Sequence, residues 1–151
     1  MAFKRWMYRD NRPHTLAKIL NRGWAWVHAW GIAPNYMVTL EVAGRQSGKI
    51  ISFPLVLVVY EGERYLASML GSEANWVRNV RAAGGQATLR HGNSEAVLLE
   101  EMDPSLCAPI LKLYLQRAPG ARPHIPVDKD APLSEFEAIT GQFPVFKVKP
   151  R

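Results

Sequence analysis

The segment from Val42 to Tyr60 constrains the fold of this chain more than any other. It begins with two closely spaced glycines, Gly44 and Gly48, and continues as an apolar run from Ile50 to Tyr60 that is rich in β-branched and aromatic residues. Glycines in a short polar stretch favour a tight turn, and a β-branched run favours an extended chain. The pattern therefore predicts two strands joined by a turn, with the second strand apolar on both faces.

The turn of this hairpin carries groups that suit an anion. A glycine-rich turn lets backbone N–H groups converge, and Arg45, Ser47 and Lys49 add donors and positive charge. The alternative is a turn whose charges only face solvent, and the turn by itself does not separate the two. A nucleotide P-loop is excluded, because three residues instead of four separate the glycines, Ile50 follows the lysine, and a strand takes the place of the helix.

The rest of the chain predicts a small sheet with peripheral helices. The predicted strands are 36–43, 50–60, 64–69, 86–91, 94–100 and 145–148, and the predicted helices are 75–83, one that begins at 103, and 133–139. The first strand alternates and is predicted to be half-buried. Six strands without regular β-α alternation indicate an α+β fold, a small barrel or a curled sheet.

Two local features indicate where a site could lie. Pro54 cannot donate a hydrogen bond to a neighbouring strand, so we expect it at a bulge or at a locally open edge of the sheet. The helix that starts at Asn75 would present free N–H donors together with Trp76 and Asn79. We expect this helix start to complete a pocket near the first hairpin.

The composition is typical of one soluble globular domain. The chain has 151 residues, of which 48% are hydrophobic and 21% are charged. It contains no apolar run long enough to span a membrane and no secretory signal, so we expect a cytoplasmic protein. Cys107 is the only cysteine. It is expected to be buried, and it excludes both an intrachain disulfide and a cysteine-based metal cluster.

The N-terminal segment differs from the remainder in charge and aromatic content. Residues 1–31 hold six cations against one acid, and four of the five tryptophans. Apolar spacing after Pro13 predicts a helix, which could pack its aromatic stripe on the sheet or lie on an anionic membrane surface. We therefore divide the chain into a basic helical segment, 1–34, and a barrel domain, 35–151. No nucleic-acid-binding motif accompanies the positive charge, so no nucleic-acid partner is expected. The sequence does not define an oligomeric state.

Residues for catalysis by the protein itself are not evident. The four histidines stand apart from other metal ligands, so no metal site is predicted, and no G-x-S-x-G element occurs. No catalytic residue is predicted. If the protein is an enzyme, a bound cofactor has to carry the reaction.

Three motifs together resemble the deazaflavin-dependent nitroreductase family. They are Gly44-Arg45-x-Ser47-Gly48, then Pro54-Leu55, and finally Asn75-Trp76-x-x-Asn79-Val80-x-Ala82. The resemblance covers roughly residues 15 to 150, and the combined spacing is more specific than any single motif. It implies a split β-barrel that binds coenzyme F-420.

The resemblance also implies how the cofactor would be held. Arg45, Ser47 and Lys49 would bind the phosphate and the anionic tail, and the deazaflavin ring would lie along 54–56 with 69–71 and Trp76 near it. The implied cofactor-binding residues are Arg45, Gln46, Ser47, Gly48, Lys49, Ser52, Phe53, Pro54, Leu55, Val56, Met69, Leu70, Gly71, Asn75, Trp76 and Asn79.

The function implied is an F-420-dependent oxidoreductase. It would transfer hydride from the reduced deazaflavin to a small electron-poor acceptor, which is a quinone, an enone or a nitro compound. The alternative is a carrier that holds the deazaflavin, or less favourably FMN, without turnover. Gln46 and Ile51 stand where relatives often have basic residues, and Val56 stands where the nitroimidazole-reducing member has a tyrosine. The resemblance therefore supports the identity of the cofactor more strongly than the identity of the substrate.

Overall fold

The computed structural model describes residues 36–151, which form a closed barrel of six antiparallel strands. The strands are β1 (Met37–Ala43), β2 (Ile50–Tyr60), β3 (Glu63–Ala67), β4 (Gln86–His91), β5 (Asn93–Glu101) and β6 (Val145–Pro150). Their order around the barrel is β1-β2-β3-β6-β5-β4, and β1 closes the barrel by pairing with β4. The α+β fold on six strands and the split-barrel class are confirmed.

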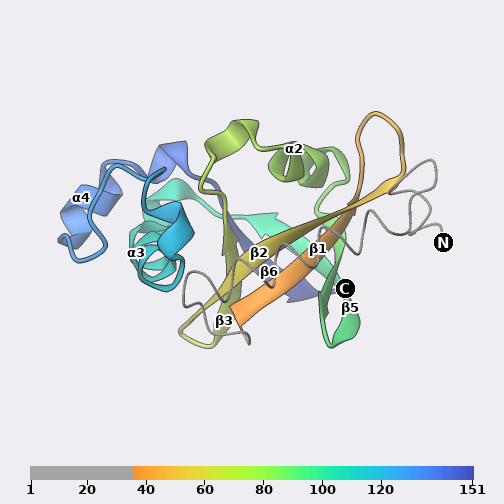
Figure 1. Cartoon of the computed structure of the whole chain (residues 1–151), viewed down its shortest axis with the longest axis horizontal. Helices are drawn as coiled ribbons and strands as arrows, with labels where there is room; N and C mark the ends of the chain where they lie inside the picture. Colours follow the sequence, from red (N-terminus) through yellow and green to blue (C-terminus); the bar gives the residue numbers. More distant parts are fainter. Residues whose placement is uncertain (1–35) are drawn as a thin grey trace.

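Within residues 36–151, three helices accompany the barrel: α2 (Asn75–Ala82), α3 (Ala108–Arg117) and α4 (Leu133–Glu137). Helix α2 lies along one side of the barrel, whereas α3 and α4 lie together at one end (Figure 1). The predicted element boundaries hold for β2 and β4 and shift by one or two residues at most other ends. The helix predicted to begin at 103 is the exception, because the 3₁₀ turn Pro104–Leu106 comes first and α3 begins only at Ala108. The region 118–132 between α3 and α4 contains only the short 3₁₀ turn Pro119–Ala121.

The buried side chains form two clusters on opposite faces of β2. Leu40 and Leu66 belong to the barrel interior, which α2 covers with Val77 and Val80. Val58 belongs to the second cluster, which lies under α3 and α4. Leu55, Val56 and Val58 bury both faces of β2 in its middle, whereas Ile51, Phe53 and Val59 are exposed, so its continuous apolar run predicts more burial than the structure shows.

The first strand is more buried than its alternation predicts. Val38, Leu40 and Val42 face the barrel interior, but Met37 on the opposite face is also only 7% exposed. Met37 packs in the cluster under α3. Where a helix covers the outer face of a strand, the side chains on that face need not be polar. The alternation of residues along the strand does not show that such a helix is present.

The barrel is split along the first half of β2. The ladder to β1 runs without a bulge from Ile50 to Val56, whereas the ladder to β3 starts only at Leu57. Pro54 pairs with Thr39 on the β1 side, and within residues 36–151 no strand pairs with 50–56 on the other side. The predicted open edge at Pro54 is thus confirmed, and the bulge is not found.

The predictions for the N-terminal segment lie outside the described residues. These are the division at residue 34, the basic helix, and its packing or membrane contact through 1–31. In the part of the chain that the structure describes, no helix is long and apolar enough to cross a membrane.

Candidate functional site

Two adjoining cavities lie along the open edge of β2. We call them the polar cavity, with a volume of about 520 Å³, and the apolar cavity, with a volume of about 140 Å³. Phe53, Leu70 and Trp76 line both. The split in the barrel therefore opens a continuous site between β2, the chain that leaves β3, and the start of α2.

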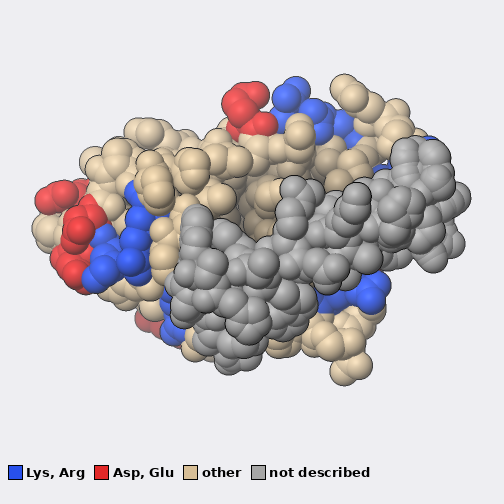
Figure 2. Space-filling view, viewed as in Figure 1, with Lys and Arg blue, Asp and Glu red and all other residues tan. Residues whose placement is uncertain are grey.

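The polar cavity is lined by the β1–β2 turn and by the first two turns of α2. Its lining residues are Val42, Gly44, Arg45, Gln46, Ser47, Ile51, Ser52, Phe53, Leu70, Ala74, Asn75, Trp76 and Asn79. None of these carries a carboxylate. On the outer face of α2, Arg78 and Arg81 are paired with Glu73 and Glu101, and positive and negative side chains lie next to each other over this helix in the space-filling view (Figure 2). The cavity is therefore suited to an anion.

Arg45 is the charged group in the wall of the polar cavity. Its backbone N–H and its Nη1 both donate to Asn79 Oδ1, at 3.1 and 2.8 Å, and its Nη2 donates to Asn75 Oδ1 at 3.4 Å. Asn79 is 2% exposed. The structure thus joins the two halves of the predicted site, the hairpin turn and the helix start, which are 34 residues apart in sequence.

The turn itself is closed by its own backbone. The Gly44 N–H donates to the Lys49 carbonyl oxygen at 2.7 Å, and the Gly48 N–H donates to the Gly44 carbonyl oxygen at 2.9 Å. Gly48 has a φ of 75°, a left-handed conformation that favours glycine. The Ser47 hydroxyl accepts the Lys49 N–H at 3.1 Å. Gly48 and Lys49 therefore shape the turn, and neither lines a cavity.

Ser52 is the second polar group of interest. It is 2% exposed, borders the polar cavity, and its hydroxyl has no hydrogen-bond partner among the described residues. A buried hydroxyl without a partner costs roughly 1–3 kcal/mol. A ligand oxygen that accepts from this hydroxyl would recover that cost.

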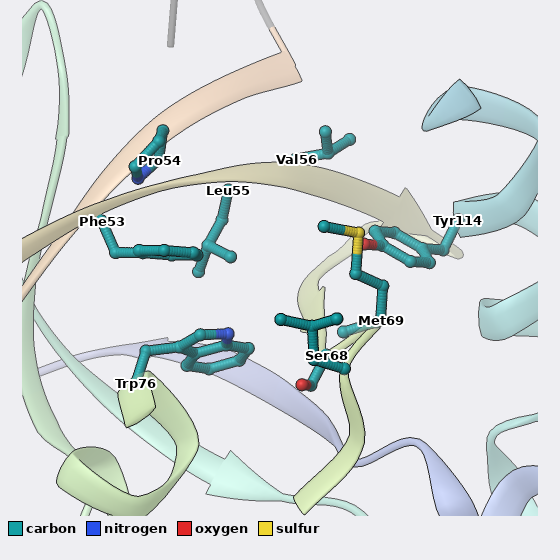
Figure 3. Close-up of a pocket in the computed structure, with 10 residues that line it drawn as sticks. Phe53, Pro54, Leu55, Val56, Ser68, Met69, Trp76 and Tyr114 are labelled. Carbon is teal, nitrogen blue, oxygen red and sulfur yellow. The ribbon is translucent and has the colours of Figure 1, made fainter. Parts of the chain in front are cut away.

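The apolar cavity continues inward from the shared wall. Its lining residues are Phe53, Pro54, Leu55, Val56, Ala67, Ser68, Met69, Leu70, Trp76 and Tyr114. The rings of Phe53 and Trp76 face each other across the opening, and Met69 and Tyr114 close the far side (Figure 3). The Trp76 indole is held from behind by Phe146, with ring centroids 5.6 Å apart. Such a cavity suits a flat, conjugated ring.

Tyr114, on α3, lines the apolar cavity but is not among the predicted cofactor-binding residues. It is 3% exposed, and its hydroxyl makes no hydrogen bond within residues 36–151. Burial raises the pKa of this hydroxyl well above its ordinary value. Helical spacing predicts that Tyr114 faces inward, but it does not reveal that the neighbouring space is a cavity.

Most of the predicted cofactor-binding residues border one of the two cavities. Gly48, Lys49 and Gly71 do not. Gly71 has a φ of 80°, and its carbonyl oxygen accepts from the Ser68 hydroxyl at 2.8 Å. Its role in this structure is to turn the chain between β3 and α2.

The chain resembles known proteins in its structure and not in its sequence. No protein-family model and no curated protein sequence matches the chain. Among solved structures, an F420-H2 dependent reductase superposes with a TM-score of 0.52 at 21% identity, and the match covers 76% of this chain and 94% of that one.

Two further solved structures share the architecture. A protein of the pyridoxinephosphate oxidase family from Clostridium acetobutylicum has a TM-score of 0.51 at 10% identity, with coverage of 88% and 84%. A heme binding protein from Mycobacterium smegmatis has a TM-score of 0.53 at 16% identity, and the match covers 84% of this chain and 51% of that one. At these identities the comparisons establish the fold, and the split β-barrel is the architecture that this chain shares with them.

Proposed function

We propose that the protein binds coenzyme F-420 across the two cavities and reduces a small electron-poor organic acceptor, which is a quinone, an enone or a nitro compound. The observation that carries the proposal is the direct junction of a cationic, donor-lined cavity with an apolar cavity between two aromatic rings. A ligand with a flat ring joined to a phosphate matches this junction.

The residues of the polar cavity fit the anionic part of such a cofactor. Arg45 supplies a charge, Ser47 and Ser52 supply hydroxyls, and among the described residues no lining carboxylate opposes a phosphate. The buried Ser52 hydroxyl, which lacks a partner in the described residues, supports an oxygen-bearing ligand at this place. Charge-assisted hydrogen bonds of this kind are stronger than neutral ones.

The apolar cavity fits the ring. Phe53 and Trp76 offer aromatic faces, and Leu55 and Val56 exclude water from one edge. When bound and reduced, coenzyme F-420 supplies a hydride. The protein's own task is then to orient the ring and the acceptor and to keep water away from them.

Binding tests the cofactor assignment. Titration of the purified chain with F-420 is expected to show binding, and Arg45→Ala should weaken it at least about tenfold, because one charge-assisted contact is lost. Lys49→Ala is the matched control and should weaken binding less, because Lys49 does not line the cavity. Equal affinity of Arg45→Ala and the unaltered protein, with circular dichroism unchanged, would refute the assignment of the polar cavity.

Turnover tests the reaction and separates an enzyme from a carrier. We expect stopped-flow mixing with reduced F-420 to show faster oxidation by menadione than by a bicyclic nitroimidazole. Val56 offers neither the ring nor the hydroxyl that a tyrosine would place against the nitroimidazole. Faster oxidation by the nitroimidazole would contradict this use of Val56. If the protein does not accelerate the oxidation of reduced F-420 by any acceptor, the carrier function is favoured.

A further inference from the structure

We propose that Asn79 is the positioning residue for Arg45: it fixes the guanidinium at the polar cavity through a neutral oxygen, so that the positive charge stays available to a phosphate. This inference rests on the proposed function, because it concerns how the same cavity selects an anionic ligand. It assigns Asn79 a role that acts through Arg45.

The geometry of Asn79 gives the first support. Its Oδ1 accepts from both the backbone N–H and the Nη1 of Arg45. Two donors on one oxygen determine which end of the amide faces the turn, so the Nδ2 group points the other way. The described residues provide no hydrogen-bond partner for Nδ2, and Asn79 borders the polar cavity. The amide therefore orients Arg45 with one end and leaves two donors with the other.

The charge of the partner gives the second support. Four other arginines in the described part of the chain are paired with carboxylates, in the pairs Arg64–Glu95, Arg78–Glu73, Arg81–Glu101 and Arg90–Glu41. Arg45 instead contacts the amide oxygens of Asn79 and Asn75, and it forms no ion pair within residues 36–151. A carboxylate would hold Arg45 more strongly but would cancel its field at the cavity.

The burial of Asn79 explains why this arrangement is effective. At 2% exposure its amide is shielded from water, so the hydrogen bonds to Arg45 are not exchanged for solvent. The bond to the Arg45 backbone also ties the β1–β2 turn to α2, so the side chain does not have to be ordered when a ligand binds. Preorganisation of this kind lowers the cost of binding.

Asn79→Asp is the decisive variant because it keeps the size and the accepting oxygen and changes the charge. If Asn79 were only structural, the variant would hold Arg45 as well or better, and any loss of affinity would come from direct repulsion between the new carboxylate and the phosphate, which would persist without Arg45. If Asn79 preserves the charge of Arg45, F-420 affinity should fall at least about tenfold, because an ion pair replaces the free cation and two amide donors are lost.

A comparison of two ligands, one with and one without the phosphate, shows whether Asn79→Asp weakens the contact to the phosphate. Affinity for F-420 and for the phosphate-free 8-hydroxy-5-deazariboflavin would be measured by calorimetry at constant ionic strength. We expect Asn79→Asp to reduce binding of F-420 and to leave the phosphate-free ligand within about twofold. Equal losses for both ligands would overturn the proposal, because they would indicate general damage to the cavity.

Three controls complete the experiment. Asn93→Asp adds the same charge at the exposed first residue of β5 and should leave both affinities unchanged. In an Arg45→Ala background, Asn79→Ala should have a clearly smaller effect than in the unaltered protein, because a residue that acts through Arg45 has nothing left to position. Alanine is used there because a carboxylate at position 79 would repel the phosphate directly once Arg45 is absent. Asn79→Ala serves if the aspartate variant folds poorly. It should reduce F-420 affinity, but by less than Arg45→Ala does.

The outcomes separate this inference from the proposed function. If the unaltered protein binds F-420 and Asn79→Asp binds it equally well, the inference fails and the proposed function stands. If the unaltered protein does not bind F-420, the proposed function fails, and inorganic phosphate becomes the probe. Greater thermal stabilisation by phosphate of the unaltered protein than of Asn79→Asp then supports the inference, and equal stabilisation overturns it.

Discussion

Tyr114 places a single hydroxyl in the wall of an otherwise largely apolar cavity. Burial raises the pKa of this hydroxyl, so it remains protonated at neutral pH and is available as a hydrogen-bond donor. It makes no bond within the described part of the chain. A carbonyl or nitro oxygen of the electron acceptor is the group that would satisfy it.

Tyr114→Phe tests this contact with the acceptor. One neutral hydrogen bond contributes about 0.5–1.5 kcal/mol, so the KM for a quinone or an enone should rise roughly twofold to tenfold at saturating reduced F-420. The dissociation constant of F-420 should stay unchanged. Tyr36→Phe is the control, because Tyr36 lies under the Arg117 guanidinium and lines neither cavity. A changed F-420 affinity with an unchanged KM would place the hydroxyl against the cofactor instead.

Cys107 connects burial to the pH dependence of stability. It is 1% exposed, and burial, with smaller effects of Asp103 and Glu101, raises the pKa of its thiol from 9.0 to about 11. As the pH rises above 9, the thiol ionises in the unfolded chain but not in the folded one. The unfolded state then binds fewer protons, so the free energy of unfolding falls until the pH passes about 11.

Cys107→Ala should remove this dependence. Relative to the alanine variant, the unaltered protein should lose about 2 kcal/mol of stability between pH 8 and pH 10.5. Urea unfolding at both pH values measures the loss. The raised pKa of Tyr114 affects both proteins alike, whereas Cys107 makes a minor contribution to the raised pKa of Tyr65 that the alanine variant loses. Parallel stability curves for the two proteins would show that the Cys107 thiol does not titrate as proposed.

At the scale of elements, the turn between α2 and β4 fixes the helix against the barrel. Gly84 and Gly85 both have positive φ, at 66° and 86°. A Cβ on Gly84 would meet open space, whereas a Cβ on Gly85 would overlap the Leu99 carbonyl oxygen. The Gly85 carbonyl oxygen also accepts the Leu99 N–H at 2.7 Å, so a hydrogen bond holds Gly85 close to β5.

The two glycines therefore form a matched pair for substitution. Gly84→Ala should cost about 1–2 kcal/mol, because only the left-handed conformation is penalised. Gly85→Ala should cost roughly 2–5 kcal/mol, because steric overlap with β5 is added to the same strain. Denaturant unfolding of both variants measures the difference. Equal losses would mean that β5 moves away from the turn without cost.

The helices and strands differ in how well the sequence predicts their ends. The run of β-branched residues at 50–60 defines β2 at both ends, because it is bounded by the turn around Gly48 and by Gly62. The start of α2 at Asn75 also agrees with its 3.6-residue spacing. Strand ends without glycine are less well defined: β6 continues to Pro150, two residues beyond the apolar pattern, because it pairs with β5 there.

For the whole molecule, the sequence by itself determined the number of strands, the α+β class and a tight turn at Gly48 with cations beside it. These follow from local properties: hydrophobic period, glycine conformation, and charge next to glycine. The open edge at Pro54 belongs to this group as well, because a residue without an N–H group restricts the ladder wherever it lies.

Only the tertiary structure decided which side chains of the site contact one another. It brought Arg45 onto Asn79, left the Ser52 hydroxyl buried without a partner in the described residues, and placed Tyr114 at a cavity wall. Each of these depends on where β2 parts from β3 and how α2 and α3 then approach the gap, and those distances arise from packing between residues far apart in the chain. Local patterns carry no information on such separations, so the sequence identified the chemical groups and the fold set their geometry.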